Sequence, residues 1–231
     1  MTTTAVIPIK QLAHAKQRLS GLLSEQERND LFRAMVEDVL VVVEVCPLID
    51  EILVVTSDAE VQDLALSFGA KIMAEPVNPG LIPAVTAAAT RLGDNGADTL
   101  VFLPGDIPLV SPEELEVVLD GFGASDLPEF HIVPAADLGG SNCVACSPPD
   151  CMTFGFGEDS FRRHLRIAED LGIVPTVTHL PGIGLDVDTP LDLEKMIEVL
   201  CTSEQQKATF KYLLDSGIVE RINPELLRLN A

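Results

Sequence analysis

The sequence predicts a three-layer α/β/α fold with a mostly parallel central sheet. Short apolar segments with the length of buried strands alternate with longer segments that carry helix-start residues. This alternation continues to about residue 123. Strands joined through crossover helices lie parallel to one another, so the sheet should be parallel over most of its width.

The first half of the chain contains four expected strands and four expected helices. Ser24 with Glu27, and Ser111 with Glu114, have the spacing of capping boxes, and Asp58 is a further helix N-cap. In order, we expect a strand at 4–9, a helix at 25–45, a strand at 51–56, a helix from 58 to 69, a strand at 70–74, a helix from 80 to 93, a strand at 99–103 and a helix from 111.

The alternation of strands and helices stops in the second half of the chain, because two strand candidates follow each other directly. The expected elements are strands at 130–135 and 141–147, a helix at 160–171, a strand at 173–179 and a helix from 189 to 200. No linker rich in glycine or serine interrupts the chain. We therefore expect one domain over residues 1–200, with a helical C-terminal extension over residues 201–231.

Composition excludes several classes of partner. The 231 residues include 36 acidic and 15 basic side chains, a formal net charge of −21. Such a surface repels the phosphates of nucleic acids and anionic lipids, so neither is an expected partner. The apolar segment 39–43 is too short to span a bilayer. The five cysteines and the absence of a secretory signal indicate a cytoplasmic protein with reduced thiols.

The few basic residues are unevenly placed. Five lie within the first 33 positions, whereas only Lys71 and Arg91 occur between residues 34 and 161. An anion bound by this chain would need the early basic residues, backbone N–H groups at helix starts, or a cation held by carboxylates.

Three aspartates follow predicted strands at positions where ligands bind in open parallel sheets. Asp106 lies in a Pro-Gly turn just after the strand at 99–103, and Asp186 and Asp188 are two apart in an extended segment, so their side chains share a face. Taken singly, Asp106 fits a turn cap and Asp188 a helix cap. Taken together, they predict a site for Mg²⁺, which prefers oxygen ligands and substrate phosphates.

The loop after the first strand carries Lys10, Lys16 and Arg18. If that strand is central and parallel, these cations lie at the same edge of the sheet as Asp106 and can hold a triphosphate. A solvent-exposed charged loop is the alternative. No Walker-type glycine loop is present, so a P-loop kinase is not expected.

Seven short motifs resemble those of the CofC/FbiD guanylyltransferases of deazaflavin coenzyme (F420) biosynthesis, which have a nucleotide-diphospho-sugar transferase-like fold. The resemblance runs from about residue 5 to residue 200. The motifs are Pro8 to Lys10, Ala15 to Leu19, Leu103 to Leu109, Gly139 to Asn142, Phe154 to Gly157, Ser160-Phe161 with His164, and Leu185 to Pro190.

The resemblance implies a reaction and a set of site residues. Family members join GMP from GTP to the phosphate of a small phosphorylated acid and release pyrophosphate. By resemblance, Asp106, Asp186 and Asp188 hold Mg²⁺, while Ser141, Gly157 and Ser160 contact the acid. Asp106 and Lys16 are the expected catalytic residues, and Lys10, Lys16 and Arg18 the expected nucleotide contacts. His164, one helical turn after Ser160, is either a substrate contact or a core histidine.

Some points stay open in the sequence. The acid is 2-phospholactate, phosphoenolpyruvate or 3-phosphoglycerate. Ile82 and Pro83 follow Gly80-Leu81 where family members commonly have asparagine and a small residue, so a cytidylyl- or uridylyltransferase of the same fold is an alternative, as is a non-catalytic nucleotide-binding scaffold. The apolar helix segment 34–45 fits the core or the face of a homodimer.

Overall fold

The computed structural model describes residues 1–202 and 207–223, and within them one seven-stranded sheet has the order β3-β2-β1-β4-β6-β5-β7. β6 is antiparallel to both of its neighbours, and every other neighbouring pair is parallel. The sheet is therefore mostly parallel, as predicted. The strands are β1 (Thr3–Pro8), β2 (Glu51–Val55), β3 (Lys71–Met73), β4 (Thr99–Phe102), β5 (Glu129–Pro134), β6 (Ser141–Ser147) and β7 (Pro175–Val177).

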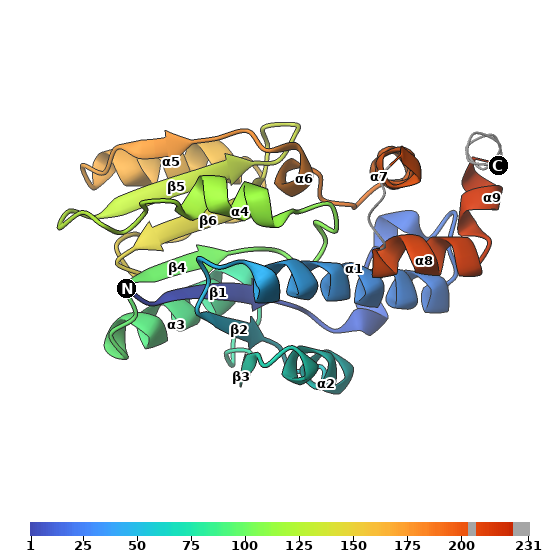
Figure 1. Ribbon diagram of the computed structural model, residues 1–231, viewed down its shortest axis with the longest axis horizontal. Coiled ribbons are helices and arrows are strands. Elements are labelled where there is room, and N and C mark those ends of the chain that lie inside the picture. The colour runs from blue at the N-terminus through green and yellow to red at the C-terminus, as the bar shows by residue number, and fades with distance from the viewer. Residues whose placement is uncertain (203–206, 224–231) are drawn as a thin grey trace.

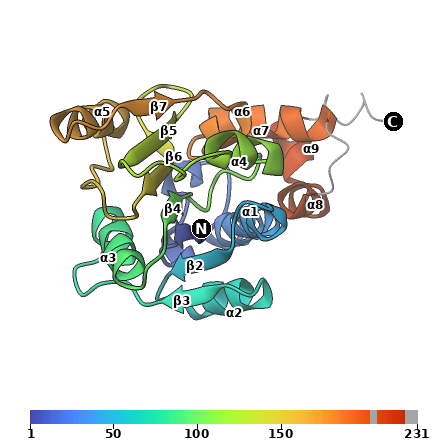
Figure 2. The same ribbon diagram turned by 60° about the vertical axis from the view of Figure 1, so that its left-hand side comes forward.

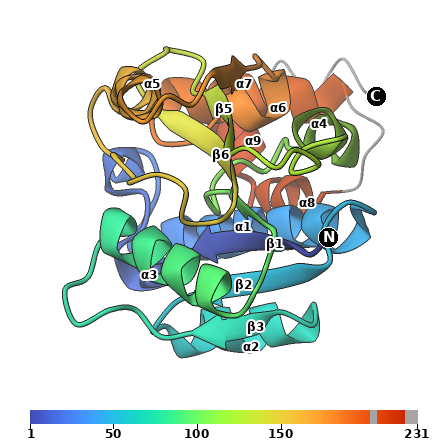
Figure 3. The ribbon, with the colours of Figure 1, turned by 90° about the vertical axis from the view of Figure 1, so that its left-hand side faces the viewer.

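Helices cover both faces of the sheet, which confirms the three layers (Figures 1 and 2). Helices α1 (Glu25–Val45), α2 (Ala59–Ser67) and α4 (Pro112–Leu119) pack on one face through one hydrophobic cluster. Helices α3 (Leu81–Asp94) and α5 (Ser160–Asp170) pack on the other through a second cluster. Figure 3 looks onto the side that α3 covers, with α1 behind the sheet.

Local sequence explains most helix starts. Ser24 and Glu27 form the predicted capping box at α1, and Asp58 caps α2 by accepting hydrogen bonds from the N–H groups of Glu60 and Val61. The prediction at α4 is half right. Ser111 accepts from the N–H of Glu114, but the Glu114 carboxylate accepts from Gly182 and Ile183 instead of completing the box.

The second half of the chain differs from the prediction in two places. The strand expected at 173–179 is reduced to the three residues of β7 at the sheet edge. A short helix, α6 (Pro181–Gly184), follows it where no helix was predicted. The N–H groups at its start are the ones that Glu114 accepts, and this accounts for the missing half of the box at α4.

The C-terminal helices form a third hydrophobic cluster with the first part of the chain. These helices are α7 (Pro190–Thr202), α8 (Ala208–Asp215) and α9 (Ile218–Ile222), and their buried side chains meet Leu19, Leu31 and Met35. They lie beyond the carboxyl ends of the parallel strands (Figure 1). The predicted extension 201–231 is helical where it is described; positions 203–206 and 224–231 lie outside the described residues.

Asp38 of α1 fixes the start of α8. Its two carboxylate oxygens accept hydrogen bonds from the N–H groups of Ala208 and Thr209 at 2.7 and 2.9 Å. No side chain of α8's own N-cap residue, Lys207, fills this role. A residue distant in sequence thus caps the helix.

Replacing Asp38 with alanine should lower the free energy of unfolding by about 2 kcal/mol, because two buried N–H groups lose their acceptor. Urea denaturation measures the change. Glu44→Ala, an exposed position on the same helix, is the control and should change stability by less than about 0.5 kcal/mol. Equal effects of the two substitutions would contradict the capping role.

Most apolar residues of α1 lie in the core of the chain, whereas Val41 and Val45 are exposed. Val41 and Val45 are therefore the exposed apolar residues that α1 offers for a homodimer contact. The homodimer itself stays a prediction.

No helix formed by the described residues has both the length and the apolar character needed to cross a membrane.

Candidate active site

Two loops meet where β1 and β4 end. The loop after β1 forms two 3-10 turns, Leu12–His14 and Gln17–Leu19, with Lys16 between them in the left-handed region at φ 51°. The loop after β4 carries Asp106 behind Gly105, where an added Cβ would lie 3.0 Å from Val36 of α1. Glycine therefore lets this turn approach the helix closely.

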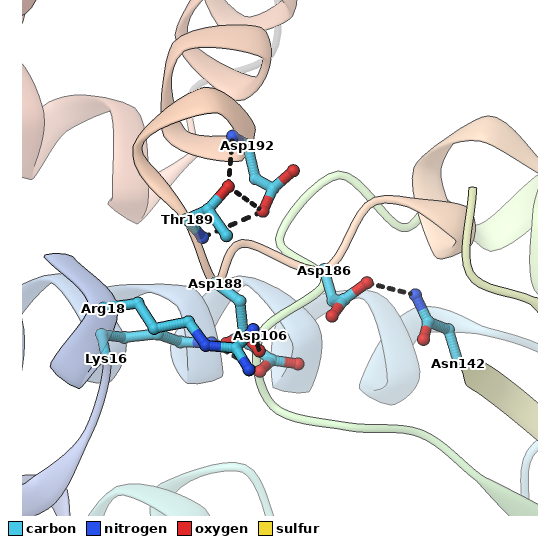
Figure 4. A network of polar contacts seen from close by, with 8 residues as sticks. All are labelled: Lys16, Arg18, Asp106, Asn142, Asp186, Asp188, Thr189 and Asp192. Atoms are coloured by element: carbon cyan, nitrogen blue, oxygen red, sulfur yellow. Dashed lines mark hydrogen bonds and ion pairs between the residues drawn. The ribbon is translucent and has the colours of Figure 1, made fainter. Parts of the chain in front are cut away.

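Lys16 lies at the centre of the site. Its Nζ is 2.5 Å from Asp106 Oδ2 and 2.7 Å from Asp188 Oδ1, and its side chain is only 4% exposed (Figure 4). Burial alone would lower the pKa of Lys16, but the charges of Asp106 and Asp188 and their hydrogen bonds outweigh it and raise that pKa. The ammonium is therefore charged at neutral pH, and it neutralises one of two adjacent carboxylates.

A backbone hydrogen bond fixes the two aspartate segments to each other. The N–H of Val187 donates to the carbonyl oxygen of Asp106 at 3.0 Å. Residue 106 and the segment 186–188 are thus adjacent in space, although they are 80 residues apart in sequence. This juxtaposition is the one that the parallel-sheet argument predicted.

The third aspartate faces elsewhere. Asp186 Oδ1 accepts a hydrogen bond from Asn142 Nδ2 at 3.0 Å, and Figure 4 shows its carboxylate turned away from Lys16. Burial raises the pKa of Asp186, with the charges of Asp106 and Asp188 acting in the same direction. Within residues 1–202 and 207–223, no group of three or more His, Cys, Asp or Glu side chains is arranged to hold a metal ion. The predicted three-aspartate magnesium site thus stays a prediction.

A cavity of about 800 Å³ opens beside Lys16. Its walls come mainly from the loops after β1 and β4, the start of α3 and Asp188. The predicted residues that line it are Lys10, Lys16, Asp106 and Asp188. Gly80 and Leu81 also line it, directly before Ile82 and Pro83, where this sequence departs from the family pattern. Arg18 is exposed, and its Nη1 lies 4.0 Å from Oδ2 of Asp188, at the outer side of the Asp106 and Asp188 carboxylates.

The predicted acid contacts gather around a second centre. Ser141 begins β6, and its Oγ lies 3.0 Å from Nδ1 of His164 on α5. The other ring nitrogen of His164 accepts from the N–H of Gly155 at 2.8 Å. Gly157, at φ 110°, accepts from the N–H of Ser160 at the start of α5. Ser141, Gly157 and Ser160 are therefore brought together, with His164 between them.

His164 is a buried neutral residue. Burial, with the charge of Arg163 adding to it, lowers the pKa of His164 to about 4. Its ring also packs edge-on against Phe156, with centroids 4.9 Å apart. Of the two roles open in the sequence, a direct cationic contact to the substrate is excluded by this burial.

The lowered pKa of His164 predicts a pH dependence of stability. Between about pH 6.5 and pH 4 the His164 ring binds a proton in the unfolded chain but not in the folded chain. The contribution of the neutral ring to folding stability is therefore complete above pH 6.5 and is lost toward pH 4. We expect the stability difference between wild type and His164→Asn to shrink by roughly 3 kcal/mol between pH 7 and pH 4 in urea denaturation. A difference that is constant over this range would contradict the assignment.

Comparison with known proteins identifies the family. A family model described as guanylyl transferase CofC like matches residues 3–223. The chain belongs to this CofC-like guanylyl transferase family. Family membership confirms the resemblance seen in the motifs, and it extends over α8 and α9, beyond the motifs themselves.

Relatives in the guanylyl transferase family differ in the acid that their names give. The chain is 32% identical over 225 residues to phosphoenolpyruvate guanylyltransferase of Conexibacter woesei, covering 97% of this chain and 100% of the relative. It is 34% identical to 3-phospho-D-glycerate guanylyltransferase of Colwellia psychrerythraea, covering 84% and 90%. It is 32% identical to 2-phospho-L-lactate guanylyltransferase of Methanothermobacter thermautotrophicus, covering 85% of each chain.

Solved structures confirm the fold of this guanylyl transferase family member. A crystal structure from Desulfovibrio desulfuricans, assigned as a nucleotide-diphospho-sugar transferase, has a TM-score of 0.76 at 19% identity and covers 99% of this chain and 98% of its own. A cytidylyltransferase from Leptospira borgpetersenii has a TM-score of 0.59 at 14% identity, covering 98% and 96%. The predicted nucleotide-diphospho-sugar transferase-like fold is thus correct.

Sequence reasoning missed two residues that shape the site. Asn142 donates to the carbonyl of Ile183 as well as to Asp186, and so ties β6 to the aspartate segment. Arg163 donates to the carbonyls of Gly155, Phe156 and Glu158 and holds the loop that contains Gly157. Asn142 lies inside a motif that carries the resemblance and Arg163 lies beside one, but their hydrogen-bond partners follow no local spacing rule.

Proposed function

We propose that this chain transfers GMP from GTP to the phosphate of a three-carbon phosphorylated acid and releases pyrophosphate, in the deazaflavin coenzyme pathway implied by its family. The observation that carries the proposal is the Lys16 ammonium between Asp106 and Asp188, at the wall of a cavity of about 800 Å³. That arrangement supplies cations and carboxylates where a triphosphate would react. The names of the relatives support the guanylyl donor and the acid class.

The acid is one of three that differ only slightly. Phosphoenolpyruvate, 2-phospholactate and 3-phosphoglycerate share a carboxylate and a phosphate, and relatives named for each are similarly identical to this chain. We assign the acid to Ser141, Gly157 and Ser160. The buried hydroxyls of Ser141 and Ser160 and the open backbone at Gly157 suit an anion at the start of α5.

The reaction needs little proton transfer. A phosphate oxygen of the acid attacks the α-phosphorus of GTP, a P–O bond forms, and the bond to the bridging oxygen of pyrophosphate breaks with its electron pair on that oxygen. The attacking phosphate is already an anion at neutral pH, so positioning and charge neutralisation carry most of the catalysis. No general base is required among the site residues.

The residues fit Mg²⁺, the predicted cofactor. Asp106 and Asp188 already converge on one positive charge, that of Lys16, and Mg²⁺ commonly uses one or two carboxylates together with substrate phosphates. We therefore propose that Asp106 and Asp188 hold the ion and that Asp186, turned to Asn142, supports them electrostatically. When bound, Mg²⁺ would neutralise charge that develops on the phosphates.

The basic residues of the first loop hold the leaving group. Lys16 and Lys10 line the cavity, and Arg18 stands outside it next to Asp188. Their positive charges would steady the pyrophosphate as it leaves. A chain of net charge −21 can bind two anions in this way because its cations are concentrated at the site.

We further propose a cytoplasmic location, since Cys143 and Cys146 are buried thiols and form no disulfide.

A pyrophosphate-release assay tests the proposal. GTP, CTP, UTP and ATP are each combined with the three acids, with Mg²⁺ and with EDTA. We expect release with GTP and at least one acid, and its loss in EDTA. Release with CTP or UTP alone would make the chain a pyrimidine nucleotidyltransferase, and tight nucleotide binding without any release would make it a scaffold. Full activity in EDTA would remove the metal from the mechanism.

A further inference from the structure

His164 connects two of the predicted acid contacts through one buried ring. Its side chain is 0% exposed, with Nδ1 at 3.0 Å from Ser141 Oγ and Nε2 at 2.8 Å from the N of Gly155. Ser141 lies on β6, and Gly155 lies two residues before Gly157 in the loop that leads to α5. The ring therefore spans from the strand to the loop.

The hydrogen bond from Gly155 fixes the position of the ring proton. A backbone N–H only donates, so Nε2 must be an acceptor and carries no proton. The neutral ring then carries its proton on Nδ1, which donates to Ser141 Oγ. A doubly protonated ring would set an N–H against the N–H of Gly155.

This tautomer determines what the hydroxyl of Ser141 can do. With a lone pair of Oγ occupied by the Nδ1–H donor, the hydroxyl proton of Ser141 points away from the ring and is free to donate. Among the described residues, the hydrogen-bond partner of Ser141 Oγ is Nδ1 of His164. The hydroxyl proton is thus available to a ligand oxygen and is not used by the ring.

The surrounding contacts keep the ring in place. Phe156 packs edge-on against it, and Phe130 lies on its other side at 6.4 Å between ring centroids. Arg163, the preceding residue, donates to three carbonyls of the same loop. The ring has little freedom to turn and reverse its donor and acceptor atoms.

We propose that His164 is a positioning residue for the phosphorylated acid: it orients the Ser141 hydroxyl as a hydrogen-bond donor to an anionic oxygen of that substrate. The inference rests on the assignment of Ser141 to the acid under the proposed function. His164 acts through Ser141 and does not touch the substrate itself. Its removal should weaken binding of the acid without weakening binding of GTP.

Two substitutions separate the two hydrogen bonds of the ring. In His164→Asn the amide nitrogen occupies the place of Nδ1 and can still donate to Ser141, whereas the acceptor for Gly155 is lost. In His164→Gln the amide oxygen occupies the place of Nε2 and can still accept from Gly155, whereas the donor to Ser141 is lost. We expect KM for the acid to rise about tenfold in the glutamine variant, with KM for GTP and kcat within about twofold of wild type. The asparagine variant should keep KM for the acid within about threefold.

A double-mutant cycle tests the route through Ser141. In a Ser141→Ala background, His164→Gln should raise KM for the acid no further. His131→Gln is the matched control, because His131 is also buried and hydrogen-bonded at both nitrogens, but on β5 and facing α4. It should leave KM for the acid unchanged. The proposal is overturned if the asparagine and glutamine variants raise KM equally, or if the glutamine effect persists without the Ser141 hydroxyl.

Two further measurements keep this inference separate from the proposed function. Nitrogen-15 NMR of the wild-type histidine should show a protonated Nδ1 and an unprotonated Nε2, unchanged from pH 5.5 to 8, whether or not the enzyme turns over. Calorimetric binding of each of the three acids is measured in the presence of a GTP analogue with a methylene α,β-bridge, and binding of the acid that the wild type takes should be weakened by His164→Gln but not by His131→Gln. Failure of all three acids to bind the wild type would refute the proposed function, whereas a protonated Nε2 would refute the positioning role.

Discussion

Replacing Asp106 with asparagine should reduce GMP transfer by about a thousandfold or more while the chain stays folded. Asp106 is the carboxylate that contacts Lys16 at 2.5 Å, lines the cavity, and is tied by its backbone to the segment bearing Asp188. The amide keeps the size of the side chain but removes the charge that pairs with Lys16 and that the proposed Mg²⁺ site would need. Pyrophosphate release measures the loss, and thermal unfolding checks the fold.

Asp63→Asn is the control for the lost charge. Asp63 is exposed on α2 and lies outside the residues that line the cavity, so its substitution should leave turnover within about twofold of wild type. Wild-type rates in the Asp106 variant, measured on folded protein, would refute the role of this carboxylate in the reaction.

Replacing Lys16 with methionine should lower kcat by roughly a hundredfold to a thousandfold. The substitution preserves much of the buried apolar stem but removes the ammonium that we propose for the triphosphate site. It should also strengthen binding of Mg²⁺ or Mn²⁺ to the nucleotide-free protein, because the ammonium no longer competes for Asp106 and Asp188. Steady-state kinetics and calorimetry with the metal alone measure these two effects.

The two readouts move in opposite directions, and this distinguishes a role in the site from general damage to the fold. Lys71→Met is the control, since Lys71 is an exposed lysine on β3 that pairs with Glu51 far from the site. It should change neither turnover nor metal binding. Weaker metal binding in the Lys16 variant would contradict competition between the ammonium and the metal ion.

The sequence predicted the layers of the fold because these depend on local patterns. Helix caps such as Ser24 and Asp58 act within a few residues, and short apolar strands separated by helices leave few alternatives to a parallel sheet. The same reasoning placed Asp106 near Asp188, since the carboxyl ends of parallel strands lie at one edge. α6 escaped prediction because four residues are too few to show a helical period.

Partners at long range were beyond sequence reasoning. Glu114 has the right spacing for a capping box, yet the buried N–H groups of Gly182 and Ile183 need an acceptor, and its carboxylate serves them. Asp186 lies two residues before Asp188 in a segment that forms no strand, and its carboxylate bonds to Asn142 of β6 and faces away from Lys16. Spacing along the chain shows which side chains come near each other, whereas the competing hydrogen bonds decide which atoms meet.

The backbone bond from Val187 to Asp106 has a consequence for how this enzyme can diversify. Because the main chain holds residue 106 next to the segment of Asp188, we expect substitutions at Ser141, Gly157 and Ser160, the proposed acid contacts, to change the choice of acid without moving Asp106 and Asp188. Asn142 is the exception on β6, because its side chain bonds to Asp186. A laboratory search for new acceptors can therefore be confined to those three positions, with Asn142 and the aspartate segments left as they are.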